Sequence, residues 1–273
     1  MEFSCFEAEK SRMQAQSCCL EQRRSELLRH VKDDLFQIGE SVAGRDGWHE
    51  AVRVYVLMND GCPLLFDSGS HIHSGEIMAE LKSLLGDTAP GYVFLTHTEL
   101  PHTGNIKLIL DVWPDTKLVV SSAILPHVEL PWWVADDQVL YGYAGTEETY
   151  GGRRISFLDG ILKDQPGTHW MYDGTTGTLF TADAFGYLYP GAADLKFDDE
   201  LEDGIAGDWL KRYHESAFRF LPMVSGAKVT ADIARVFRKR DVRAIAPTHG
   251  NAVRHDIAQC IDRFNNAILE ICR

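Results

Sequence analysis

Hydrophobic positions in the first half of the chain alternate between strand-like and helix-like spacing. "VRVYVLMND" and "PLLFDSGS" are β-rich runs joined through Asn-Asp-Gly, which predicts a hairpin. "SGEIMAELKSLLGD" has helical periodicity, with Ser74 as its cap and Gly86 near its end. "GYVFLTH" is a short apolar run typical of a buried strand, "TGNIKLILDVWPD" predicts a helix, and "TKLVVSS" predicts the next strand.

The second half repeats this organisation. "RRISFLD", "THWMYD" and "GTLFTAD" predict short strands, and helices are expected near residues 200–216 and 227–240. "RAIAP" predicts a further strand, followed by a terminal helix over about 254–271. A β-rich part followed by helices, occurring twice, predicts an α/β domain with two sheets covered by helices.

The segment before these elements has a different pattern. Residues 20–34, "LEQRRSELLRHVKDD", carry apolar side chains at helical spacing and predict a helix. We therefore expect an N-terminal helical extension over residues 1–35 and one domain over residues 36–273, without an internal linker.

Composition narrows the classes of function. The net charge of −13 argues against a nucleic-acid or anionic-membrane surface, because such surfaces need clustered Lys and Arg. No apolar run approaches the roughly 20 residues of a membrane span, and the polar N-terminus does not resemble a secretion signal. The six cysteines form no CxxC and are too sparse for a disulfide scaffold, which favours a cytoplasmic location.

Potential metal ligands lie at the ends of several predicted strands, where loops converge in α/β architectures. His97 ends one strand and is followed by Glu99 and His102 in "THTELPH". The complete set has four imidazoles and two carboxylates: His97, Glu99, His102, His169, Asp183 and His249. Six ligands exceed one tetrahedral zinc site, whereas two ions bridged by a carboxylate accommodate them. A thiolate-free imidazole and carboxylate set suits non-haem iron.

Other notable side chains have two interpretations. A histidine in such a chain is most often an ordinary core or surface residue, and no role is assigned to His30, His49, His127, His214 and His255. Aromatic residues near the expected ligands either line an apolar pocket or pack in the core; they are Trp132, Trp133, Trp170, Phe185, Tyr187 and Tyr189.

Four motifs together resemble the metallo-β-lactamase superfamily and, within it, the flavodiiron branch. They are "LLFDSG", "FLTHTELPHTGN", "GTHWMYDGTTGTLFTADAFG" and "AIAPTHG", and the similarity covers about residues 36–265. The resemblance implies an αββα sandwich of two mixed sheets, with metals at one edge between them. It implies a first iron held by His97, Glu99 and His169, a second held by His102 and His249, and Asp183 as the bridge. Hydrolytic members mostly carry His where this chain has Glu99.

Pro101 is the departure from the pattern, because the flavodiiron branch has an aspartate ligand there and proline offers no donor atom. Three outcomes follow: a weakly bound second ion with an open position, a replacement ligand such as His71 or His73, or a site with one metal or none. Further candidates for contact with the substrate or the ligands are Asp67, Trp133 and Tyr187.

The functional expectation is a non-haem diiron protein that binds or activates dioxygen, either reducing O2 or NO or oxidising a small organic substrate. The alternatives are a diiron oxygen sensor that signals through a partner and a dinuclear metal-dependent hydrolase. No catalytic residue is assigned. Because the sequence ends at Arg273 without a flavodoxin-like domain, we expect electrons from a donor protein, from the substrate, or from a flavin held with a partner, with a homodimer as one arrangement.

Overall fold

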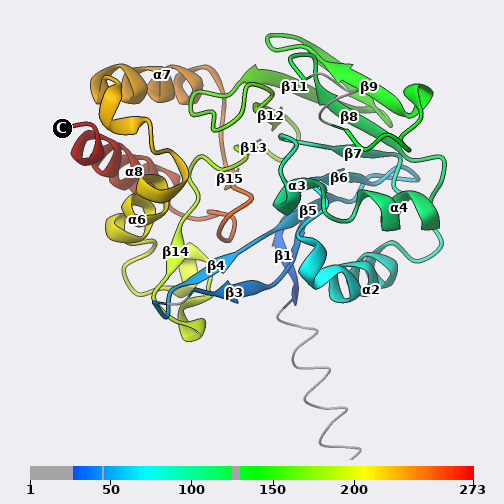
Figure 1. The fold of residues 1–273 in the computed structure, drawn as a ribbon, viewed down its shortest axis with the longest axis horizontal. Coiled ribbons are helices and arrows are strands. Elements are labelled where there is room, and N and C mark those ends of the chain that lie inside the picture. The colour runs from blue at the N-terminus through cyan, green and yellow to red at the C-terminus, as the bar shows by residue number, and fades with distance from the viewer. Residues whose placement is uncertain (1–26, 45, 125–129) are drawn as a thin grey trace, which may run out of the picture.

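The computed structural model describes residues 27–44, 46–124 and 130–273. Two β-sheets pack face to face and helices cover both outer faces (Figure 1). The seven-stranded sheet is mixed: its first four strands pair antiparallel and its last four pair parallel. Its order is β1 (Leu28–Lys32), β2 (Leu35–Ile38), β5 (Val54–Leu57), β6 (Leu64–Phe66), β7 (Tyr92–Phe94), β8 (Lys117–Ser121) and β9 (Val139–Gly142).

The second sheet has five strands, antiparallel except for its last pair. Its order is β10 (Glu147–Tyr150), β11 (Arg153–Asp159), β12 (His169–Asp173), β13 (Thr178–Phe180) and β15 (Ala244–Ala246). A small antiparallel ribbon lies beside both sheets and consists of β14 (Leu188–Tyr189), β4 (His49–Ala51) and β3 (Ser41–Ala43). This ribbon brings the strand that carries Glu50 to the same edge as the loop after β15, because Val52 forms a bridge with His249.

Helices complete the outer layers (Figure 1). On the seven-stranded side lie α2 (Ser74–Leu85), α3 (Leu100–Thr103) and α4 (Ile106–Val112), and on the other side lie α6 (Gly207–Ala217), α7 (Gly226–Lys239) and α8 (Ile257–Ile271). Short 3-10 turns are η1 (His71–His73), η2 (Asp136–Gln138), η3 (Ala192–Asp194), η4 (Asp198–Glu200) and η5 (Leu221–Met223). Three apolar clusters fill the two helix–sheet interfaces and the space between the sheets. The αββα sandwich expected from the sequence is confirmed.

Aromatic rings join the two sheets. Phe66 at the end of β6 stacks on Phe180 at the end of β13, with ring centroids 3.6 Å apart and planes inclined by 3°. On its other side Phe66 faces Phe94 of β7 at 4.9 Å. All three rings are buried in the layer between the sheets. The strand ends that precede the polar loops are therefore held at a fixed separation by close-packed rings.

Most of the elements predicted in the first subsection are confirmed. The β5–β6 hairpin is antiparallel, and α2, α4, α7, β7, β8, β11, β12, β13 and β15 lie where the pattern placed them. Ser74 is the first residue of α2 rather than its cap. Helix α6 begins at Gly207, later than expected, because the chain turns at Gly204 with φ of 67°. The terminal helix begins at Ile257, where the Asp256 carboxylate accepts from the Gln259 amide.

The predicted helix over residues 20–34 is wrong for its second half, and residues 20–26 lie outside the described part. Leu28–Lys32 is strand β1, which pairs with β2 at the edge of the large sheet and buries Val31 between the sheets. The apolar spacing there fits a strand as well as a helix, and pairing with β2 decided the outcome. The sheet domain therefore includes these residues. None of the described helices is long and apolar enough to cross a bilayer.

His214 on α6 is enclosed in the outer core, stacked on Phe218 and edge-on to Phe264. Its Nδ1 meets the Leu210 carbonyl oxygen at 2.8 Å, whereas its Nε2 has no partner among the described residues. Burial lowers the pKa of His214 to about 4, so the ring stays neutral at neutral pH.

This burial predicts an acid-dependent loss of stability. Unfolded His214 binds a proton below about pH 6.5 and the folded residue does so only near pH 4, so the free energy of unfolding falls across this window by about 3 kcal/mol from this residue. His214→Phe should remove that part of the decline in urea titrations between pH 4 and 7. Exposed His255→Gln is the control, and an unchanged slope in His214→Phe would contradict the assignment.

Candidate metal centre

Asp67, directly after β6, is the hub of a buried polar network. Its backbone adopts a left-handed conformation with φ of 59°, and its carboxylate is 2% exposed. It accepts hydrogen bonds from the Thr96 amide at 2.8 Å, the Thr248 hydroxyl at 2.7 Å and the His102 Nδ1 at 2.7 Å. Burial opposes its ionisation, but His102 and the donors together hold its pKa below the usual value. One carboxylate thus ties β6 to the loops after β7 and β15.

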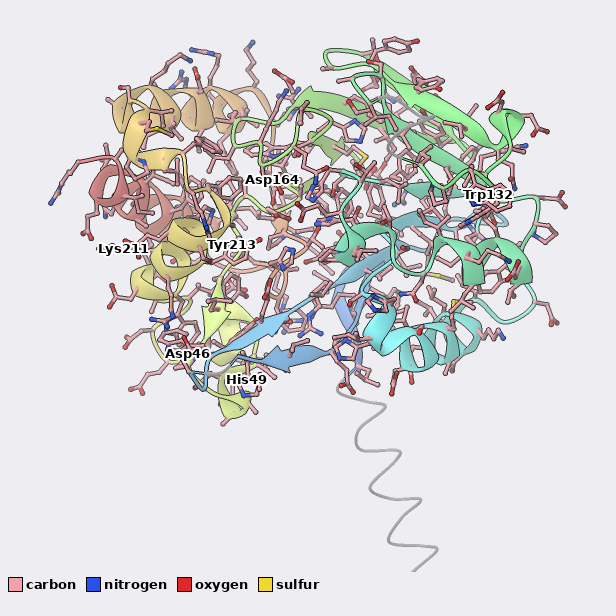
Figure 2. The ribbon with its side chains drawn as sticks, in the orientation of Figure 1. Asp46, His49, Trp132, Asp164, Lys211 and Tyr213 are labelled. Carbon is pink, nitrogen blue, oxygen red and sulfur yellow. The ribbon has the colours of Figure 1, made fainter. Side chains whose placement is uncertain are left out.

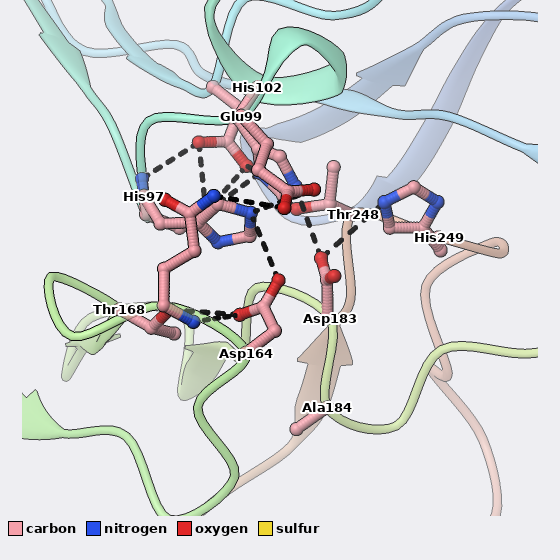
Figure 3. Close-up of polar contacts among 12 residues, drawn as sticks. His97, Glu99, His102, Asp164, Thr168, Asp183, Ala184, Thr248 and His249 are labelled. Carbon is pink, nitrogen blue, oxygen red and sulfur yellow. Dashed lines mark hydrogen bonds and ion pairs between the residues drawn. The ribbon is translucent and has the colours of Figure 1, made fainter. Parts of the chain in front are cut away.

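Beyond Asp67, His102 turns its other nitrogen toward Asp183. The His102 Nε2 lies 3.1 Å from the Asp183 Oδ1, and the His249 Nε2 approaches the same oxygen at 3.4 Å (Figure 3). The His102 Nε2 and the Asp183 Oδ1 are buried and make no well-formed hydrogen bond within the described chain. Polar atoms that converge without pairing are costly unless a cation satisfies them, so this arrangement suits a metal ion.

The second group of donors lies around His97. Its Nε2 is 3.6 Å from the Asp164 Oδ2 and 4.0 Å from the Glu99 Oε2. Neither of its ring nitrogens forms a hydrogen bond with a described residue. His97, Glu99, Asp164 and Asp183 each offer a donor atom within 4.8 Å of one another, as do His97, His102 and Asp183. Asp183 and His97 belong to both groups, which is the arrangement that two neighbouring ions require.

Hydrogen bonds from behind orient most of these donors, as metal ligands commonly require. The hydrogen-bonded pairs are Glu99 with Gln165 at 2.9 Å, Asp164 with Thr168 at 3.0 Å and His102 with Asp67 at 2.7 Å, and the Glu50 carboxylate lies 2.7 Å from the His249 Nδ1 as an ion-pair contact without well-formed hydrogen-bond geometry. In each pair the second residue contacts the atom or ring edge that faces away from the shared donors. The site is therefore held in place before any ion binds.

His169 is not among these groups, whereas the resemblance implies that it joins His97 and Glu99, and its Nδ1 is buried without a partner in the described residues. Its Nε2 donates to the Leu95 carbonyl at 3.0 Å, and its backbone amide donates to the Thr96 carbonyl at 3.0 Å. His169 thus fastens β12 to the segment that carries His97. Asp164, in the loop before β12, stands where His169 was expected. Asp164 also lies next to the end of a strand, but histidine is the more common metal ligand, so the residue type favoured His169.

The electrostatics of the centre favour a cation. Burial and the neighbouring His102 lower the pKa of His97 to about 3. Burial opposes a charge on His102, yet Asp67 and Asp183 raise its pKa to about 10. Burial and the charge of Asp183 raise the pKa of Asp164 to about 6. Buried carboxylates thus stabilise positive charge between them, which a metal ion supplies more fully than a proton does.

Tyr213 of α6 is a neighbour that the sequence did not indicate. Its ring stacks on His249 with centroids 5.3 Å apart. Burial, together with the charge of Asp183, raises the pKa of Tyr213 well above its usual value, so the phenol stays protonated. Glu50 was also missed, since a glutamate in a three-residue strand carries no distinctive local signal.

Several predicted candidates lie outside the groups of donors. His71 is exposed, and the His73 Nε2 lies 4.0 Å from the Glu40 Oε2 in the turn before α2. Pro101 occupies the first turn of α3, where its ring contributes no donor. His127 falls outside the described residues. Neither His71 nor His73 therefore belongs to the groups of donors found in the described residues.

The aromatic candidates divide between core and surface. Trp170, Phe185, Tyr187 and Tyr189 are completely buried in the core beneath α6 and α8, and the Tyr187 hydroxyl donates to the Asn251 carbonyl at 2.9 Å. Trp133 packs against the core on the α2 and α4 side. Trp132 is 94% exposed and lies across the molecule from Tyr213 (Figure 2). For the four buried rings the core interpretation holds.

The family profile described as "ODP family beta lactamase" matches residues 51–250, a span that includes every donor described above. The chain belongs to this ODP family. This ODP family protein is 23% identical over 211 residues to a nitric oxide reductase of Moorella thermoacetica, covering 77% of the chain and 51% of the relative. The chain thus spans about half the length of that curated relative.

Solved structures share its fold. Rubredoxin oxygen:oxidoreductase from Desulfovibrio gigas superposes with a TM-score of 0.71 at 18% identity, over 90% of this chain and 60% of that one. A variant of the flavo di-iron protein from Thermotoga maritima superposes with a TM-score of 0.73 at 17% identity, over 88% of this chain and 62% of that one. The ODP family protein therefore has the fold of a flavodiiron metallo-β-lactamase core.

A matched pair of substitutions separates the roles of Asp164 and His169. Asp164→Asn removes a charged donor and should lower the affinity for the metal beside His97 by roughly tenfold or more, with little change in melting temperature of the metal-free protein. His169→Gln breaks the link to Leu95 and should lower that melting temperature by several degrees. Chelator competition and calorimetry measure the two effects, and the reverse outcome would restore His169 as the ligand.

Proposed function

We propose that this ODP family protein holds two iron ions and uses them to bind or activate dioxygen, either reducing O2 or NO or oxidising a small organic substrate. The observation that carries the proposal is the Asp183 Oδ1, which two imidazole Nε2 atoms approach from different loops while His97 and Asp164 face it from the other side. The names of the relatives, a nitric oxide reductase and a rubredoxin oxygen:oxidoreductase, support the same class of chemistry.

The donors fit two ions unequally. His97, Glu99, Asp164 and the shared Asp183 would hold the first ion, and this set of three carboxylates and one imidazole favours a hard ion such as iron over zinc. His102 and His249 with Asp183 would hold the second ion, with open positions because Pro101 supplies nothing. The flavodiiron resemblance implies an aspartate at position 101 beside the second ion, where this chain has Pro101. It implies His169 beside the first ion, where this chain offers the carboxylate of Asp164.

The bound ions would supply the redox chemistry. The surrounding residues of this chain would orient the metal-binding side chains and hold protons beside them. Asp67 keeps a proton on the His102 Nδ1, which leaves the Nε2 lone pair directed at the site, and the Glu50 carboxylate, 2.7 Å from the His249 Nδ1, favours a proton on that nitrogen. Tyr213 retains its hydroxyl proton beside Asp183, because burial raises its pKa, and can donate a hydrogen bond to charge that develops there.

Electrons would come from a donor protein or from the substrate, and a flavin would come from a partner. A homodimer and a cytoplasmic location belong to the same proposal. The net charge of −13 favours neither nucleic acid nor an anionic membrane as a partner.

Metal content and gas consumption test the function. Protein from iron-replete cells should contain close to two irons per chain and absorb in the near ultraviolet, where oxo-bridged iron absorbs. With a chemical reductant it should consume O2 or NO catalytically, and Asp183→Asn should abolish this consumption. Stoichiometric zinc with ester or amide hydrolysis would overturn the proposal in favour of a hydrolase, whereas reversible O2 binding without turnover would select the sensor.

Restoring a carboxylate at Pro101 tests the imbalance between the two sites. Pro101→Asp should tighten the second ion by roughly tenfold or more, about 1.4 kcal/mol, and slow its removal by a chelator. Leu100→Asp is the matched control, because it adds the same charge at a side chain that is 64% exposed. Equal effects of the two variants would show that general charge, not ligation, is responsible.

A further inference from the structure

Arg53, which lies between Val52 and strand β5, is a buried cation that forms no ion pair with a carboxylate in the described part of the chain. Its side chain is 4% exposed, and its Nη1 donates to the Gly39 carbonyl, the one hydrogen bond from its side chain to a described residue. Its Nε is buried and unpaired. Burial lowers the pKa of Arg53, and only tyrosine hydroxyls offset this effect. An uncompensated buried guanidinium is costly, so this arrangement calls for an anion.

Arg53 lines a cavity of about 690 Å³. Arg29, Arg53 and Lys196 contribute three cations to its wall, against the single carboxylate of Glu40. Arg29 pairs with Glu200, so Arg53 and Lys196 are the two cations of this wall that no described carboxylate pairs, in a chain whose net charge is −13. Leu27, Ala193 and Leu195 form an apolar part of the same wall. A cavity of this size, partly apolar and with a few converging polar groups, is typical of a small-molecule site.

We propose that this cavity binds a phosphate monoester. The two cations that no described carboxylate pairs, Arg53 and Lys196, match the charge of a phosphate monoester at neutral pH, which is close to −2. The planar guanidinium of Arg53 presents paired donors that match phosphate oxygens. The apolar wall would receive the organic part of the molecule, which inorganic phosphate lacks.

The cations of the wall are positioned for this role. The Arg29 guanidinium lies over the Phe197 ring at 4.0 Å and pairs with Glu200, so its location at the cavity is fixed. Lys196 is exposed and forms no ion pair with any described residue, which leaves its ammonium group available to a ligand. Arg53 lies deepest, where an oxyanion would be most desolvated and its hydrogen bonds strongest.

This site is separate from the metal centre, since none of the proposed metal donors lines the cavity. The two are nevertheless joined through the backbone. The Arg53 amide donates to the Thr248 carbonyl at 2.8 Å, and neighbouring Val52 bridges His249. The proposal does not depend on which metals the centre holds, so binding at the cavity can be measured whatever the outcome for the proposed function.

Calorimetric titration of the full-length, metal-loaded protein tests the proposal directly. The probes are AMP and glucose 6-phosphate, with adenosine, glucose and inorganic phosphate as comparisons at constant ionic strength. We expect saturable binding of at least one ester at one per chain, at least tenfold tighter than inorganic phosphate, and no binding of the uncharged compounds. Failure of both esters to bind, or binding no tighter than that of inorganic phosphate, would overturn the proposal.

Two substitutions assign any binding to the cavity. Lys196→Glu changes an exposed wall residue and should weaken the ester by at least tenfold, whereas Lys82→Glu makes the same change on the exposed face of α2 and should leave binding unchanged. Arg53→Lys keeps the charge but removes the paired donors and should also weaken binding, with metal content and melting temperature reporting that the fold persists. Equal effects of Lys196→Glu and Lys82→Glu would assign the interaction to overall charge and contradict a site.

Discussion

The buried carboxylate of Asp67 is the constraint on which the metal centre depends. It contacts two connections at once, the one after β7 through the Thr96 amide and the His102 imidazole and the one after β15 through the Thr248 hydroxyl. A negative charge this deep is stable only with several donors, so the loops that provide them converge on it. Its left-handed backbone is the conformation that turns the chain out of β6 toward these partners. The orientation of His102 toward Asp183 follows from this arrangement.

The distribution of carboxylates gives the centre two unlike halves. Glu99 and Asp164 lie on the His97 side, while the His102 and His249 side shares only Asp183. Negative charge stabilises a cation most where it is concentrated, so the His97 side should fill first and retain its ion longer. The other side, richer in imidazole and with positions left open, is where an exogenous molecule would meet the centre most readily.

The sequence predicted the sandwich from local patterns, and most of the ligands it predicted lie together around Asp183. Short apolar runs located β7, β13 and β15, and the polar residues that end them are the ones that converge. Three features depend on long-range geometry instead. Strand β1 forms because it pairs with β2. Asp164 reaches the donors only through the path of the loop before β12, and Glu50 only through the bridge that brings its strand beside His249. His169 carries the expected residue type and its Nε2 donates to the Leu95 carbonyl, but it lies outside the clustered donors, and its role as a ligand stays a prediction.

The stacked rings of Phe66 and Phe180 have a consequence for the geometry of the centre. Asp67 follows one ring by a single residue, and Asp183 follows the other by three, so the separation of these two acids is set by the thickness of an aromatic ring. An aromatic ring is rigid and the interior is close-packed, so the two stacked rings keep a fixed distance between the strands that carry them. Replacing either ring with a flexible aliphatic chain of similar volume would let the sheets shift, so a core position that offers no donor atom would alter how Asp67 and Asp183 hold the His102 imidazole between them.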